Sequence, residues 1–154
     1  MEIISIGSAS IFTSIPESSH EELPHSIIEE NIMEWISWAY FDGASSHENK
    51  CRAGLIIHLN PHKSLKSSVG LGNETNNFAE LTTLKLLLFW LIHLGISMIQ
   101  IFEDSLNTIK WFNGSIKCHN YMLSAHLEET MHLKSHFNII SLCHIYRERN
   151  DAVD

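Results

Sequence analysis

The succession of hydrophobic patterns after residue 37 constrains the fold more than any other feature of this sequence. Three stretches, WAYFDG, AGLIIHL and SLKSSVGLG, have the apolar content or alternation of β-strands, and we expect the first to end in a glycine turn. Short polar connections between them favour an antiparallel meander. A long helical pattern follows, from an Asn N-cap at 76 or 77 to a stop at Gly95. Leucines recur on one face of this helix, at Leu81, Leu84, Leu88 and Leu91.

The rest of the chain adds two strands that are reached through helices. SMIQIFED and NIISLCHIYRE are typical of strands, whereas SLNTIKWF and residues 121–136 are typical of helices. Strands joined by helical crossovers lie parallel. We therefore predict an α/β fold with a mixed five-stranded sheet, made of a three-strand antiparallel meander plus two parallel strands and flanked by helices. RNDAVD should open another helix, and we expect that C-terminal helix to be missing.

Composition divides the chain into an arm and one domain. Residues 1–37 contain Ser/Glu/Pro clusters and predict an acidic, partly disordered N-terminal arm, followed by a domain over 38–154. The most apolar stretch, residues 86–94, is too short to span a membrane, so we expect no membrane association. The three scattered cysteines favour reduced thiols and an intracellular setting, in the nucleus or the cytoplasm.

Four acidic residues stand in separate predicted elements. Asp42 and Asp104 end two strands, Glu80 lies in the first turns of the long helix, and Asp154 follows the last strand. Because ligands usually bind at the carboxyl ends of strands in open α/β sheets, the four carboxylates could converge there. Close carboxylates repel one another unless cations neutralise them, and hard divalent ions such as Mg²⁺ suit them. Two such ions can activate water and stabilise the leaving oxygen in phosphodiester hydrolysis.

The formal charge of −8 argues against a nucleic-acid-binding protein, but its distribution weakens that argument. The first 39 residues hold seven of the eighteen acidic residues and none of the ten basic ones. The remainder therefore has eleven acidic and ten basic residues, and without the four candidate acids its net charge is +3. We expect weak nucleic-acid binding in the absence of metal.

Four signatures resemble ribonuclease H of the type-1 fold, especially the ribonuclease H-like domain of plant non-LTR retrotransposon reverse transcriptases. They are Y-F-D-G-A-S at 40–45, T-N-N-F-A-E-L at 75–81, E-D-S at 103–105 and H-I-Y-R-E-R-N-D-A-V-D at 144–154. They occur in the family's order and cover roughly residues 38–154. The resemblance implies a metal-dependent endonuclease that hydrolyses the RNA strand of RNA–DNA hybrids. It also implies two Mg²⁺ ions, with Mn²⁺ as a substitute, and a monomer that can be part of a larger reverse-transcriptase polyprotein.

The resemblance assigns a role to each matching residue. Asp42, Glu80, Asp104 and Asp154 match the catalytic, metal-binding acids, and His144 matches a histidine that assists proton transfer and product release. Other positions match contacts to nucleic acid, where the 2′-hydroxyl distinguishes RNA from DNA. These are Gly43, Ala44, Thr75, Asn76, Asn77 and Ser105.

Two departures from the family pattern leave other interpretations open. Glu103 replaces the small or neutral residue usual before the third acid, and the chain stops at Asp154. A catalytically decayed, nucleic-acid-binding relic of a retrotransposon ribonuclease H domain is therefore an alternative. A protein-interaction module that uses the acidic arm is a third. Taken singly, each acid is more typical of a turn or a helix cap, as Asp104 before Ser-Leu-Asn illustrates.

Overall fold

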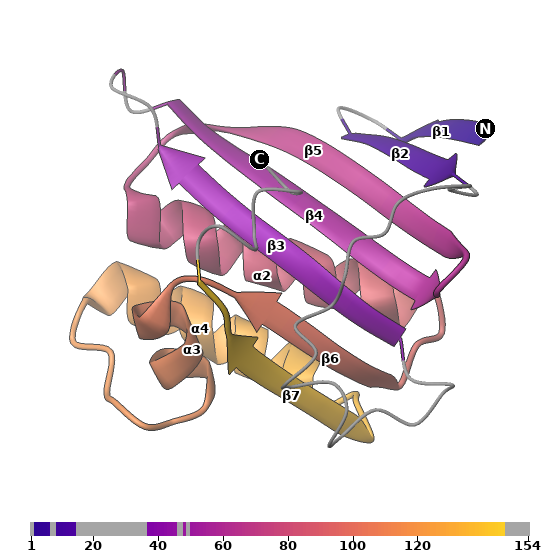
Figure 1. Cartoon of the computed structure of the whole chain (residues 1–154). Helices are drawn as coiled ribbons and strands as arrows, with labels where there is room; N and C mark the ends of the chain where they lie inside the picture. Colours follow the sequence, from indigo (N-terminus) through magenta and orange to yellow (C-terminus); the bar gives the residue numbers. More distant parts are fainter. Residues whose placement is uncertain (1, 7–8, 15–36, 46–47, 49, 147–154) are drawn as a thin grey trace.

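The structure, a computed structural model, describes residues 2–6, 9–14, 37–45, 48 and 50–146. One twisted sheet has helices packed against it (Figure 1). Its strands are β1 (Glu2–Ile6), β2 (Ala9–Ser14), β3 (Ser37–Ser45), β4 (Lys50–Asn60), β5 (Lys63–Asn73), β6 (Met98–Glu103) and β7 (Ile139–His144). The helices are α2 (Asn76–His93), α3 (Leu106–Phe112) and α4 (Tyr121–Lys134).

The five strands from β3 to β7 form the mixed sheet that the sequence predicts. β3, β4 and β5 make an antiparallel meander, β6 pairs with β3 in parallel, and β7 pairs with β6 in parallel. The predicted fold class is therefore confirmed. One detail is wrong, because β3 does not end in a turn at Gly43 but continues as a paired strand to Ser45.

Two further strands extend the sheet beyond the prediction. β1 and β2 pair with each other, and β2 adds antiparallel to the edge of β5, which gives the order β1-β2-β5-β4-β3-β6-β7. Both strands lie in the segment that the composition assigns to an arm. Pairing along a sheet edge uses backbone groups, so it needs little hydrophobic pattern in the added strand. The boundary between arm and domain at residue 37 stays a prediction.

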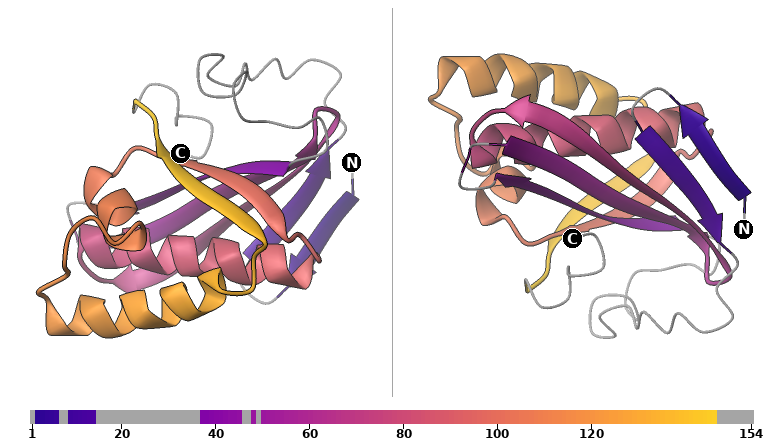
Figure 2. Two further views of the ribbon diagram at one scale, coloured as in Figure 1. Left: turned by 90° about the horizontal axis from the view of Figure 1, so that it is seen from below. Right: turned by 90° about the horizontal axis from the view of Figure 1, so that it is seen from above.

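The described helices lie on one face of the sheet (Figure 2). Between them and the sheet is the main core, in which side chains of β3, β4 and β6 pack against the leucines of α2. The four leucines predicted for the buried face of α2 are fully buried, as is Leu87. The other face carries a smaller cluster that includes Trp38, Tyr40 and Phe102. None of the described helices combines the length and hydropathy that a membrane crossing requires.

Candidate metal centre at the strand ends

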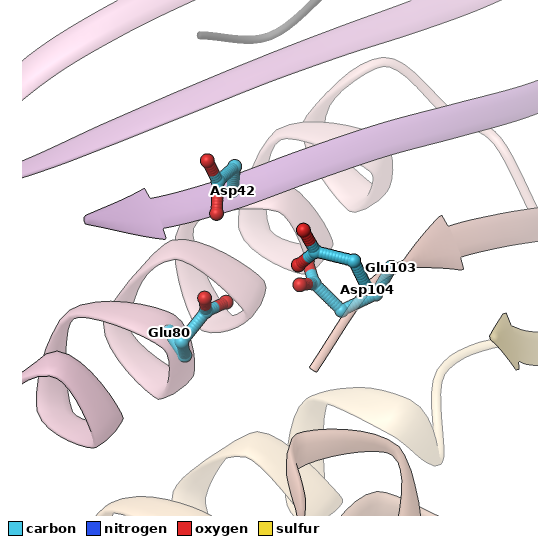
Figure 3. Close-up of side chains that lie close together, drawn as sticks. All are labelled: Asp42, Glu80, Glu103 and Asp104. Carbon is cyan, nitrogen blue, oxygen red and sulfur yellow. The ribbon is translucent and has the colours of Figure 1, made fainter. Parts of the chain in front are cut away.

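Three of the four predicted acids lie close together, near the C-terminal ends of β3 and β6 and the N-terminal end of α2. Asp42 lies in β3, Glu80 lies in the second turn of α2, and Asp104 follows β6 directly. They are joined by Glu103, and one carboxylate oxygen from each residue lies within 4.8 Å of the others (Figure 3). The two strands are parallel neighbours, so their carboxyl ends reach the same edge of the sheet.

The start of α2 is fixed by two sets of hydrogen bonds. The hydroxyl of Thr75 caps the helix by accepting a hydrogen bond from the backbone N–H of Phe78 at 3.2 Å. The thiol of Cys51, on β4, donates to the carbonyl oxygen of Glu74 at 2.9 Å and lies 3.8 Å from that of Thr75. These contacts hold the first turn of α2 against the meander, and they therefore set the position of Glu80.

Gly43 allows β3 to touch the backbone of α2. A Cβ atom at this position would lie 2.4 Å from the carbonyl carbon and oxygen of Ala79 and 2.6 Å from the backbone nitrogen of Glu80. Glycine alone fits such a close approach. The backbone of Gly43 also hydrogen-bonds to the Glu80 carboxylate. The glycine therefore brings Asp42, the residue before it, next to Glu80.

Two carboxylates of the cluster are buried. Glu80 is 4% exposed and Glu103 is 0% exposed, and the Oε2 atom of each has no hydrogen-bond partner. Burial, followed by the charges of Asp42 and Asp104, raises the pKa of Glu80 to about 8. Burial, followed by the charge of Glu80, raises the pKa of Glu103 well above its usual value. Oxygen-only donors that are buried and incompletely paired fit a hard divalent cation.

The raised pKa of Glu80 predicts a pH-dependent stability of the metal-free protein. The folded pKa of about 8 exceeds the ordinary value of 4.5, so the contribution of Glu80 is fully present below pH 4.5 and is lost as pH rises through 8. In EDTA, we expect the Tm of Glu80→Gln to exceed that of the parent increasingly between pH 5 and pH 8.5. A difference in Tm between Glu80→Gln and the parent that stays constant across this pH range would contradict the raised pKa of Glu80.

The residues predicted to contact nucleic acid surround the cluster. Thr75, Asn76 and Asn77 are exposed at the start of α2, and Ala44 is exposed one residue beyond the buried Gly43. Ser105 caps α3, because its hydroxyl oxygen accepts from the backbone N–H of Thr108 at 3.5 Å and from its hydroxyl at 3.1 Å. The structure thus gives Thr75 and Ser105 a capping function, and their contacts to nucleic acid stay predictions.

His144 and Asp154 complete the predicted site. His144 is the last residue of β7 and pairs in register with Glu103, so the two side chains leave the sheet on the same face. Its ring lies 6.0 Å from that of Tyr146, centroid to centroid. Asp154 lies outside the described residues. The part assigned to each in catalysis stays a prediction.

Glu103 is the residue that the sequence interpretation left out of the site. The sequence marks it only as a departure from the family pattern, whereas the structure places it inside the cluster. Strand alternation could have indicated this position. Ile101 faces the main core, and residue 103, two positions further along β6, faces the same side of the sheet.

Comparison with known proteins places these features in a family. A family model described as reverse transcriptase-like matches residues 40–154, which include the whole acid cluster. RNase H1 from the halophilic archaeon Halobacterium salinarum is 26% identical with a TM-score of 0.69, over 76% of this chain and 92% of the archaeal chain. The N-terminal RNase H domain of a Mycobacterium tuberculosis protein is 24% identical with a TM-score of 0.72, over 77% and 87% of the two chains.

A third solved structure is similar in the same way. LC11-RNase H1, isolated from compost by a metagenomic approach, is 23% identical with a TM-score of 0.71, over 77% of this chain and 91% of that chain. It was solved in complex with an RNA/DNA hybrid.

Proposed function

Because this chain belongs to the reverse transcriptase-like family and carries a ribonuclease H-like domain, we propose that it is a metal-dependent endonuclease that hydrolyses the RNA strand of RNA–DNA hybrids. The convergence of Asp42, Glu80 and Asp104, with Glu103, carries this proposal, because their carboxylate oxygens come within 4.8 Å of one another. The complex of LC11-RNase H1 with an RNA/DNA hybrid supports the class of substrate.

In this proposal the acids hold two Mg²⁺ ions, with Mn²⁺ as a substitute. The ligands are Asp42, Glu80, Asp104 and Asp154. When bound, divalent cations would lower the pKa of the attacking water and stabilise the negative charge on the leaving oxygen. The protein contributes the positions of the carboxylates: Gly43 holds β3 against α2, and the capped first turn of α2 fixes Glu80.

The residues around the cluster position the hybrid and move protons. Thr75, Asn76 and Asn77 offer exposed polar side chains beside the acids, which suits the recognition of 2′-hydroxyls on the RNA strand. Gly43, Ala44 and Ser105 line the same edge, where small side chains let the backbone of the hybrid approach. His144, at the end of β7, transfers protons, since an imidazole ring can both accept and donate a proton. One chain supplies the whole set of acids, so a monomer suffices, alone or within a larger reverse-transcriptase polyprotein.

Cleavage of a labelled RNA–DNA hybrid tests the proposal directly. With Mg²⁺ or Mn²⁺ we expect cuts in the RNA strand, and with EDTA we expect none, because the carboxylates alone cannot activate water at neutral pH. A DNA duplex and an RNA duplex of the same sequence serve as controls and should stay intact. Hybrid binding that needs no metal, without cleavage by the folded protein, would contradict the proposal and favour a decayed relic.

A further inference from the structure

Glu103 is a buried carboxylate of which only one oxygen accepts a hydrogen bond from a donor. Its side chain is 0% exposed, although it lies at the end of β6 where the sheet opens to the site. Oε1 accepts a hydrogen bond from the backbone N–H of Ser105 at 3.0 Å. Oε2 accepts a hydrogen bond from no donor, and the side chain lies within hydrogen-bonding reach of the carboxylates of Glu80 and Asp104. A cap for the turn before α3 accounts for Oε1, but it does not explain why Oε2 is buried without a donor.

The charged groups around the Glu103 carboxylate are negative. Glu80, which is also buried with an unpartnered Oε2, and Asp104 are the charged groups that act on Glu103. The ion pairs found in the described part of the chain, Lys50–Glu48 and Lys85–Glu129, involve neither of the two buried acids. A carboxylate that is buried without a compensating cation is strongly disfavoured. A bound cation would supply this compensation.

The spacing of the four carboxylates can accommodate a small cation. Ligand oxygens lie about 2.0–2.1 Å from an octahedral Mg²⁺ ion, so adjacent ligands are about 2.9 Å apart and opposite ligands about 4.2 Å apart. The four carboxylate oxygens, including the one from Glu103, all fall within 4.8 Å of one another. In Figure 3 the Glu103 and Asp104 carboxylates lie side by side, facing Asp42 and Glu80.

We propose that Glu103 is a further metal ligand of this site, so that one of the two cations is held by four carboxylates, from Asp42, Glu80, Glu103 and Asp104. The proposal rests on the proposed nuclease function for the presence of a divalent ion, and it adds a ligand from the strand end itself. It also predicts that a high-affinity ion is held by residues upstream of position 154. Glu103 is then a part of the metal centre, although the sequence marks it only as a departure from the family pattern.

The variant Glu103→Gln distinguishes metal binding by Glu103 from its hydrogen bond to the turn before α3. The glutamine amide oxygen can keep the hydrogen bond from Ser105, while the second oxygen is replaced by an NH₂ group that cannot bind a cation. In EDTA we expect a higher Tm than that of the parent, because a buried charge next to Glu80 is removed. By isothermal titration calorimetry we expect Mg²⁺ and Mn²⁺ to bind at least about tenfold more weakly. Glu128→Gln, an equal charge change at an exposed position on α4, should leave both quantities unchanged.

A second variant and a parallel cleavage assay keep the outcomes separate. Glu103→Asp retains the negative charge, but its side chain is one methylene group shorter, so its carboxylate lies further from the other three. We expect its metal affinity to lie between those of the parent and Glu103→Gln. An unchanged or tighter metal affinity in Glu103→Gln would overturn the inference, as would a parent chain that binds no metal. If the parent cleaves the hybrid but Glu103→Gln binds metal normally, only this inference fails. If Glu103→Gln binds metal more weakly than the parent but the parent itself does not cleave the hybrid, the proposed nuclease function fails and the assignment of Glu103 as a metal ligand stands.

Discussion

Replacing Asp42 by Asn should lower the rate of hybrid cleavage by at least about a thousandfold while leaving the fold intact. The carboxylate of Asp42 lies within the four-residue cluster, and Asn offers a neutral oxygen of almost the same shape. A bound metal ion contributes several kcal/mol to charge stabilisation in the transition state, and each 1.36 kcal/mol is a factor of ten in rate. The measurement is single-turnover cleavage of the labelled hybrid at saturating Mg²⁺.

The same variant should be more stable than the parent when no metal is present. The charge of Asp42 is the second cause, after burial, of the raised pKa of Glu80. Removing that charge relieves repulsion in the folded state, so the Tm in EDTA at pH 8 should rise. Glu128→Gln on α4 is the matched control, and neither its rate nor its Tm should change. An Asp42→Asn variant that cleaves as fast as the parent would refute the assignment of this residue.

The opposite signs of these two effects are expected of a site that is organised for a ligand. A set of neighbouring carboxylates destabilises the metal-free fold, and natural proteins keep such strained arrangements where function needs them. Mutations that only damage packing would lower the Tm and the activity together. A rise in Tm combined with a loss of cleavage therefore distinguishes a functional acid from a structural one.

The sequence predicted the parts of the fold that depend on local pattern. The leucine repeat of α2 identified its buried face, because helical periodicity directly reports which side chains share a face. The proximity of Asp42 and Asp104 could also be predicted, since Asp42 lies in one strand and Asp104 directly follows another, and parallel pairing aligns the two strands. The β1–β2 hairpin escaped prediction because edge pairing uses backbone groups that every sequence offers.

The features of the site that the sequence did not predict depend on contacts between residues that are distant in sequence. The alternation of β6 indicates which side of the sheet Glu103 faces, but its proximity to Glu80 and Asp42, which come from other elements, is reported by no local pattern. Gly43 was interpreted as a turn residue because glycine most often marks a turn. In the structure it lies within a paired strand, and its missing side chain is needed only because Ala79 packs against it. A prediction from sequence would have needed the register of β3 against α2.

Replacing Gly43 by Ala should therefore destabilise the protein and impair the site together. The added Cβ would lie 2.4 Å from the Ala79 carbonyl group, which is helix backbone and cannot rotate away as a side chain could. Overpacking typically costs 1–3 kcal/mol, and a clash between backbone elements lies at or above about 3 kcal/mol. For a chain of this size that corresponds to a fall in Tm of roughly 6–12 °C. Displacing Asp42 from Glu80 by about 1 Å should also reduce cleavage about a hundredfold.

Gly70→Ala is the control that isolates the contact with α2. Gly70 is exposed on β5, and a Cβ atom there would meet nothing within 4 Å. Alanine at an unstrained glycine position usually stabilises by about 0.4–1 kcal/mol, because it restricts the unfolded chain. Thermal melts of both variants, with cleavage measured well below each Tm, separate loss of fold from loss of alignment. If Gly43→Ala were as stable and as active as Gly70→Ala, β3 would not need to touch α2, and the acids would have to be positioned by other contacts.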